Sequence, residues 1–94
     1  MKIHFSYTGQ LAASAGVAEE TVELAAEATV LSALRDRMAM HSGKFAELLS
    51  DDSGAPRSTL LVALNDEQVA GDAYASTVLT DGNNLMLMTP IAGG

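Results

Sequence analysis

The 94-residue sequence contains no cysteine, few aromatic residues and no long apolar run. The absence of cysteine excludes a disulfide scaffold, a thiolate metal site and a cysteine nucleophile. Because only 4% of the residues are aromatic, the core of any fold has to be built from aliphatic side chains and methionine. No apolar stretch approaches the roughly 20 residues that a membrane-spanning helix requires, so no membrane association is expected.

Basic residues are also scarce. Five lysines and arginines stand against twelve aspartates and glutamates, which gives a formal net charge of −7. A negative surface repels the phosphates of nucleic acids, so nucleic-acid binding is not expected. Such a surface suits a partner with a basic docking face, and it equally serves solubility alone. The first residues, 1–5, show neither the apolar core nor the cleavage site of a signal peptide, and we expect a cytoplasmic protein.

Hydrophobic periodicity predicts a single α+β domain over residues 1–94. Ile3, Phe5 and Tyr7 alternate with polar residues, as in a half-buried strand. The other predicted elements, in chain order, are a short helical turn within 8–16, a strand at 20–25, a helix from Thr29 to Gly43, a short helical segment that contains Phe45, a loop at 51–58, a strand from Leu60 to Leu64, a short edge strand at Val69, a turn at 80–83 and a strand from Leu85 to Thr89. This order predicts one mixed sheet of four to five strands with one main helix packed across one face.

The main helix is predicted from its first residue and from its apolar face. Thr29 is a favoured N-cap residue. Behind it, apolar residues recur at helical spacing: Val30, Leu31, Leu34 and Met38. The charged run 35–37 is expected on the exposed side of this helix, and Gly43 is expected to end it.

Motifs of conventional active sites are missing. The sequence has no nucleophile elbow, no P-loop, no zinc-peptidase motif and no dinucleotide-binding fingerprint. His4 and His41 fall on separate predicted elements, and ordinary structural roles explain both. An enzyme that acts alone is therefore not expected.

The C-terminal residues 90–94 are predicted to form an extended, flexible tail. Pro90 ends the last strand because proline cannot donate a ladder hydrogen bond, and the four residues after it reach roughly 13 Å when stretched. Gly93-Gly94 is the slimmest peptide available, so it can thread a narrow site in a partner. The Gly94 carboxylate would then be the reactive group, after activation as an acyl adenylate. A frayed terminus without function is the alternative.

The last predicted strand is apolar on both faces. Leu85 and Leu87 alternate with Met86 and Met88, although a two-layer domain covers only one face of its sheet. The uncovered methionines would form an exposed patch that binds a partner, and Leu61 and Ala63 would lie on the same face. Alternatively, a loop covers them or the strand is buried on both sides.

The C-terminal segment resembles that of the MoaD/ThiS family of ubiquitin-like sulfur carriers. The likeness rests on Thr80-Asp81-Gly82, on the apolar strand after it and on the ending Pro90-Ile91-Ala92-Gly93-Gly94. It is closest to the small subunit of molybdopterin synthase. Three positions depart from the family pattern: Asn83 replaces an acid, Met88 replaces a common aromatic residue and Thr89 replaces the first of two prolines.

This resemblance implies a β-grasp fold and a sulfur carrier for molybdenum cofactor biosynthesis. An E1-like enzyme would adenylate Gly94 with ATP, sulfur would convert the adenylate to a thiocarboxylate, and Gly93 would be the slim neighbour. No cofactor would be bound tightly, and the chain would be the sulfur-carrying subunit of a sulfurtransferase complex. The implied partners are the E1-like enzyme and the large subunit of molybdopterin synthase. Residues expected to contact them are Leu61, Met86, Met88, Pro90, Ile91 and Ala92.

Three alternatives remain open from the sequence. A similar C-terminus would serve a sulfur carrier for thiamine or cysteine synthesis. A lysine amine could attack the activated Gly94 instead of sulfur, which would make the chain a ubiquitin-like protein modifier. Finally, the face with Met86 and Met88 could bind a partner without any chemistry.

Overall fold

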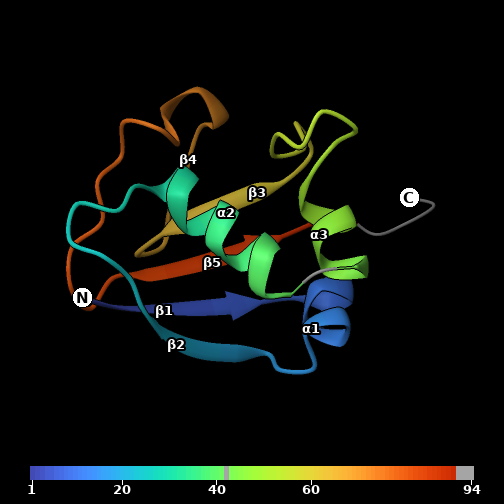
Figure 1. Cartoon of the computed structure of the whole chain (residues 1–94), viewed down its shortest axis with the longest axis horizontal. Coiled ribbons are helices and arrows are strands. Elements are labelled where there is room, and N and C mark those ends of the chain that lie inside the picture. The colour runs from blue at the N-terminus through green and yellow to red at the C-terminus, as the bar shows by residue number, and fades with distance from the viewer. Residues whose placement is uncertain (42, 91–94) are drawn as a thin grey trace.

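The computed structural model describes residues 1–41 and 43–90 (Figure 1). Its elements, in chain order, are β1 (Lys2–Tyr7), α1 (Gly9–Ala15), β2 (Glu19–Glu23), α2 (Val30–Met40), α3 (Lys44–Leu49), β3 (Leu61–Leu64), β4 (Glu67–Val69), the 3-10 turn η1 (Gly71–Ala73) and β5 (Asn84–Met88). The α+β prediction is confirmed: a five-stranded sheet carries α2 across one face, as in a β-grasp fold. Two further short helices lie at one end of the sheet.

The last strand of the chain occupies the centre of the sheet. The strand order is β2-β1-β5-β3-β4. β5 runs parallel to β1 and antiparallel to β3, and the remaining neighbours are antiparallel pairs. Because β5 is central, its alternating side chains are fixed on both sides by a hydrogen-bonded neighbour. Pro90 follows directly on this strand, whereas the predicted tail residues Ile91, Ala92, Gly93 and Gly94 lie outside the described part of the chain.

The core lies between the sheet and the helices. Phe5 of β1, Val62 of β3 and Leu87 of β5 are fully buried and point toward the helices. They meet Val30 and Leu34 of α2, which are also fully buried. Leu11, Phe45 and Leu49 close the core at the end of the sheet where α1 and α3 lie. The core is mainly aliphatic, as predicted, but the methionines are not among its buried residues. The four aromatic residues of the chain are also buried in it: Phe5, Tyr7, Phe45 and Tyr74.

Both ends of the main helix are set by specific residues. At its start, the Thr29 side chain accepts a hydrogen bond from the Ser32 backbone N–H (3.1 Å), and the Ser32 hydroxyl accepts one from the Thr29 N–H (2.8 Å). This reciprocal capping satisfies two amide groups that a helix start leaves free. The predicted end at Gly43 was wrong, because α2 ends at Met40. Gly43, with a φ of 83°, instead precedes the first turn of α3.

The predicted exposure of Arg37 was also wrong. Its side chain is only 5% exposed, whereas Arg35 lies on the exposed face as predicted. Arg37 follows Val30 by seven residues and Leu34 by three, so it falls on the buried stripe of α2. A guanidinium can occupy such a position only where acidic partners compensate its charge. Those partners are described below.

The segments around β4 and η1 complete the structure. Tyr74, just after η1, is buried, and the Leu79 N–H donates to the Ala28 carbonyl at 2.8 Å. Together they fasten this long connection onto the start of α2. Within residues 1–41 and 43–90, no helix is long and apolar enough to cross a membrane.

Candidate functional site

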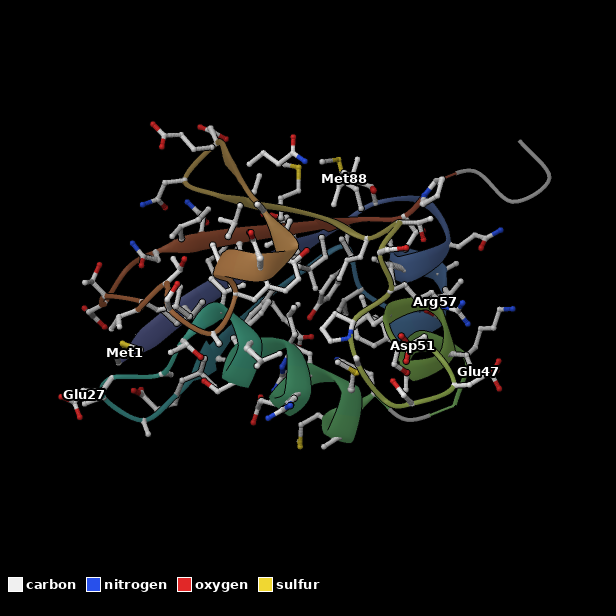
Figure 2. All side chains as sticks on the ribbon, turned by 90° about the horizontal axis from the view of Figure 1, so that it is seen from above. Met1, Glu27, Glu47, Asp51, Arg57 and Met88 are labelled. Atoms are coloured by element: carbon white, nitrogen blue, oxygen red, sulfur yellow. The ribbon has the colours of Figure 1, made fainter. Side chains whose placement is uncertain are left out.

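The open face of the sheet carries an apolar cluster at the end of β5. The register pairs Met88 with Leu61 and Met86 with Ala63, so all four side chains share one face. Leu61 is 43% exposed, and both methionines are partly exposed. We call these four residues the methionine patch. Figure 2 shows Met88 on the side of the sheet that faces away from α2 and α3.

Adjacent residues of β5 have opposite environments. Leu85 and Leu87 are completely buried in the core, whereas Met86 and Met88 remain accessible. The alternative that β5 is buried on both faces is therefore wrong for the described structure. An exposed apolar cluster on a small domain is typical of a partner-binding surface. Methionine is suited to such a surface because its flexible thioether adapts to differently shaped partners.

The tail starts beside this patch. The last hydrogen-bonded pair of the β3–β5 ladder is Leu61 with Met88, and Thr89 and Pro90 follow at once. Pro90 is exposed and lines a groove of about 230 Å³ together with Lys44 and Arg57. The structure thus brings together the predicted residues Leu61, Met86, Met88 and Pro90. The predicted residues Ile91, Ala92, Gly93 and Gly94 lie outside the described range.

A turn before β5 fixes the strand against β1. Asp81 Oδ1 accepts a hydrogen bond from the Lys2 N–H at 2.6 Å, and Asn83 Oδ1 accepts one from the Thr80 N–H at 2.7 Å. Gly82 adopts a φ of 86°, a conformation that favours glycine. The Asn83 amide oxygen supplies the acceptor that an acid would supply at this position, so its departure from the family pattern leaves the turn intact.

The other half of the open face is polar. His4 of β1 lies between two β2 residues: its Nε2 contacts Glu19 Oε1 at 2.8 Å, and its Nδ1 contacts Thr21 Oγ1 at 3.1 Å. This agrees with the alternation predicted for the first strand, in which polar residues such as His4 lie opposite to Ile3 and Phe5. Because both ring nitrogens have partners, the geometry explains His4 without a catalytic role.

A second titratable cluster lies on the helix-covered side and was not predicted. Glu20 Oε2 accepts hydrogen bonds from the Tyr7 hydroxyl (2.5 Å) and from His41 Nε2 (2.6 Å), and it lies 3.2 Å from Arg37 Nη1. Asp36 Oδ2 takes the other end of the guanidinium at 2.6 Å. The alternation of β2 carried a signal for this cluster, because Glu20 lies on the same face of the strand as Val22, which points toward the core.

The pKa shifts in this cluster have structural causes, namely burial, hydrogen bonds and charge compensation. Burial raises the pKa of the Tyr7 hydroxyl, and the neighbouring Glu20 carboxylate raises it further. Burial alone would raise the pKa of Glu20. The hydrogen bonds from Tyr7 and His41 and the charge of Arg37 outweigh it and lower that pKa. Since the charges compensate one another, the cluster joins β2 to α2, and this structural role accounts for its members.

A metal centre finds no support in this structure. Among residues 1–41 and 43–90, no three histidine or acidic side chains come together in a way that could hold a metal ion. With no cysteine in the sequence, thiolate ligation is also excluded. The reactive group that the sequence predicts, the Gly94 carboxylate, lies outside the described residues.

Comparisons with known proteins agree with this arrangement. A model of the ThiS family matches residues 5–94. The fold is similar to SAMP1 from Haloferax volcanii, with a TM-score of 0.86 and 24% identity over 100% of both chains. It is also similar to a Pyrococcus furiosus protein described as molybdopterin converting factor subunit 1, with a TM-score of 0.75 and 25% identity over 97% of this chain and 99% of that one.

The structure of the BexX/CysO complex from Amycolatopsis orientalis contains a further similar chain. Its TM-score is 0.68, with 27% identity over 98% of this chain and 99% of that one. No curated protein sequence matches. The family match extends over nearly the whole chain and agrees with the five-stranded sheet and its open face. The chain therefore belongs to the ThiS family of ubiquitin-like sulfur carriers.

Proposed function

We propose that this chain carries sulfur on Gly94 for the synthesis of molybdopterin. The observation that carries the proposal is the family match to residues 5–94, which includes the terminal Gly93-Gly94. The geometry supports it, since the methionine patch lies directly beside the start of the tail. A partner that covers the patch would have the C-terminus within reach.

The proposed chemistry has two steps. An E1-like enzyme binds ATP, and the Gly94 carboxylate attacks the α-phosphate; a C–O–P linkage forms and pyrophosphate leaves. Hydrosulfide, the co-substrate of this step, then attacks the activated carbonyl carbon; a C–S bond forms, the C–O bond to AMP breaks, AMP leaves, the hydrosulfide proton goes to water and the terminus becomes a thiocarboxylate. Gly93 permits the approach because it has no Cβ. In this proposal Met86, Met88 and Leu61 bind the partner, while Pro90, Ile91 and Ala92 lead the terminus into it.

The assignment to molybdopterin rests on the C-terminal pattern and on the likeness to molybdopterin converting factor subunit 1. In that route, the final partner is the large subunit of molybdopterin synthase. A second candidate is favoured by the likeness to CysO, which the Amycolatopsis orientalis structure shows in complex with BexX. In this second case the same Gly94 thiocarboxylate would serve a different sulfur acceptor.

Pyrophosphate exchange tests the first step. The wild-type chain, incubated with an E1-like adenylating enzyme, ATP and labelled pyrophosphate, should support exchange of label into ATP. A matched variant with one alanine added beyond Gly94 should support none, because its terminal carboxylate is displaced from the reacting position. Equal exchange with the two chains would contradict the proposal. Co-purification with the large subunit of molybdopterin synthase, compared with a BexX-like partner, distinguishes the two acceptors.

A further inference from the structure

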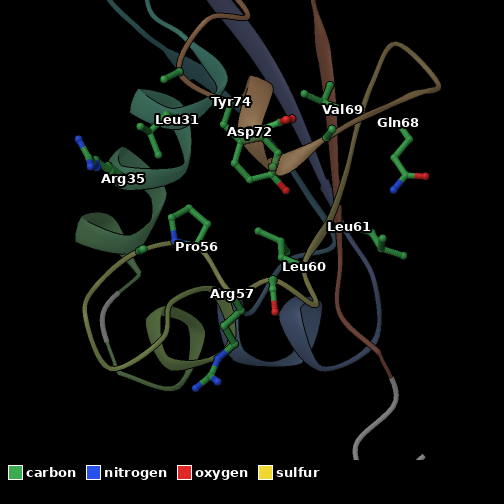
Figure 3. Close-up of a pocket in the computed structure, with 15 residues that line it drawn as sticks. Leu31, Arg35, Pro56, Arg57, Leu60, Leu61, Gln68, Val69, Asp72 and Tyr74 are labelled. Carbon is green, nitrogen blue, oxygen red and sulfur yellow. The ribbon is translucent and has the colours of Figure 1, made fainter.

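A groove lies at the edge of the sheet, next to the methionine patch. It has a volume of about 440 Å³ and is formed by α2, the loop before β3, the end of β4 and η1. Figure 3 shows Pro56, Leu60 and Tyr74 lining its interior, with Arg35 on the α2 side and Arg57 on the loop side. The groove thus combines an apolar interior with a rim that carries two basic residues, Arg35 and Arg57, and one acidic residue, Asp72.

Two residues connect this groove to the methionine patch and to the start of the tail at Pro90. Leu61 lines the groove and is also a member of the methionine patch. Arg57 lines both this groove and the smaller one from which Pro90 leads into the tail, where Lys44 lies as well. A protein that encloses the tail and covers the patch would therefore extend over the groove.

The charge distribution around the two grooves differs from that of the whole chain. They contain three of the five basic residues, Arg35, Lys44 and Arg57, and two of the twelve acidic residues, Glu47 and Asp72. In the described residues, no acidic side chain lies within 4 Å of the three basic groups. A chain with a net charge of −7 thus places three of its five basic residues around these two neighbouring grooves.

The loop that carries Arg57 is held in place. The Arg57 N–H donates to the Leu49 carbonyl, and Arg57 Nε donates to the Glu47 carbonyl, both at 2.8 Å. Asp51 Oδ1 accepts from the N–H groups of Ser53 and Ala55 at 2.9 and 3.2 Å. The guanidinium is therefore pre-positioned, which reduces the entropy lost when a partner binds it.

We propose that this groove binds a segment of the activating enzyme that carries acidic side chains next to an apolar one. The carboxylates would pair with Arg35 and Arg57, and the apolar side chain would enter between Pro56 and Tyr74. The inference rests on the proposed function, since it assigns the groove to the protein that activates the tail. It adds a charged contact to the apolar docking of the methionine patch.

Charge reversal tests the inference. Arg35→Glu is the main variant, because Arg35 makes no hydrogen bond with its side chain in the described structure and its loss should leave the fold intact. Lys2→Glu is the matched control, since it changes the net charge equally at the far end of β1. Pyrophosphate exchange is measured against chain concentration with the E1-like enzyme. We expect the half-saturating concentration to rise about fivefold or more for Arg35→Glu and less than about twofold for Lys2→Glu.

Two variants of Arg57 provide a second test in the same pyrophosphate-exchange assay. Arg57→Lys keeps the charge and should retain most of the affinity, whereas Arg57→Glu should weaken binding at least as much as Arg35→Glu does. Equal values for Arg35→Glu and Lys2→Glu, with an active wild-type chain, would overturn the groove assignment alone. No exchange with the wild-type chain would overturn the proposed function and this inference together. If the wild-type chain self-associates and Arg35→Glu abolishes that self-association, the groove binds a second copy of the chain. The assignment to an enzyme segment would then be wrong.

Discussion

The two faces of the sheet differ although the same strands build both. On the helix-covered face, β5 contributes Leu85 and Leu87, which are completely buried. On the open face, the same strand contributes Met86 and Met88, which remain partly exposed. The branched leucines fill fixed positions in a close-packed core, whereas the unbranched methionines suit a surface that adapts to a partner.

This difference separates stability from function within one strand. Burial on the covered face supplies the free energy that holds the sheet to α2, and the open face can change with little effect on that free energy. The charged clusters follow the same division. Glu20 of β2 and Arg37 of α2 compensate each other's charge, whereas Arg35 and Arg57 at the groove form no ion pair within the described residues.

The largest expected effect on stability comes from a matched pair of truncations in β5. Leu87→Ala should lower the free energy of unfolding by about 3 kcal/mol, because it removes a fully buried side chain and leaves a cavity. Met86→Ala should lower it by about 1 kcal/mol or less, because that side chain is partly solvated in the folded protein. Urea denaturation of both variants measures the difference. Equal losses would show that the two faces are not energetically distinct.

A smaller loss is expected at the cluster beneath β2. Glu20→Ala should lower the free energy of unfolding by about 2 kcal/mol, because it leaves the buried Arg37 guanidinium with Asp36 as its remaining acidic partner. Glu67→Ala, on the exposed edge strand, is the control and should change little.

The Glu20 effect should depend on pH. Folding lowers the pKa of Glu20 below its ordinary value of 4.5, so its stabilising contribution is fully present above that value. The contribution is lost as the pH falls through the lower pKa of the folded state. The difference in stability between wild type and Glu20→Ala should therefore shrink in acid. A difference that stays constant down to pH values well below 4.5 would contradict this role.

The smallest effect on folding, with a clear effect on binding, is expected at the methionine patch. Met88→Ser should change the free energy of unfolding by about 1 kcal/mol or less. It should raise the half-saturating concentration for the activating enzyme about tenfold, which corresponds to about 1.4 kcal/mol. Met40→Ser makes the same change at an exposed site on α2 and should leave binding unaffected. Equal binding by the two variants would remove the patch from the docking surface.

Much of the fold could be predicted because its signals are local. Alternation at Ile3, Phe5 and Tyr7 and the cap at Thr29 each need only neighbouring residues. The helical period also puts Arg37 on the buried stripe of α2, but its charge predicted exposure, because the acidic partner that permits its burial, Glu20, belongs to another element. The end of α2 was missed because Gly43 is equally suited to follow one helix or to precede the next.

Part of the candidate site could likewise be predicted from the sequence and part could not. The period of β5 predicted that Met86 and Met88 share a face, and the register with Leu61 confirmed their placement together. The groove with Arg35 and Arg57 could not be predicted, because segments far apart in the sequence form it. The role of Gly94 stays a prediction from the sequence and the family.

The most direct test of the central claim is intact mass spectrometry of the chain after incubation with the E1-like enzyme, ATP and a sulfur donor. We expect a mass gain that matches replacement of one oxygen by sulfur, located on the C-terminal fragment that ends at Gly94. The location decides the outcome, because oxidation of any of the five methionines gives nearly the same gain. An unmodified C-terminal fragment, with an enzyme shown to be active, would contradict the assignment of this chain as a sulfur carrier.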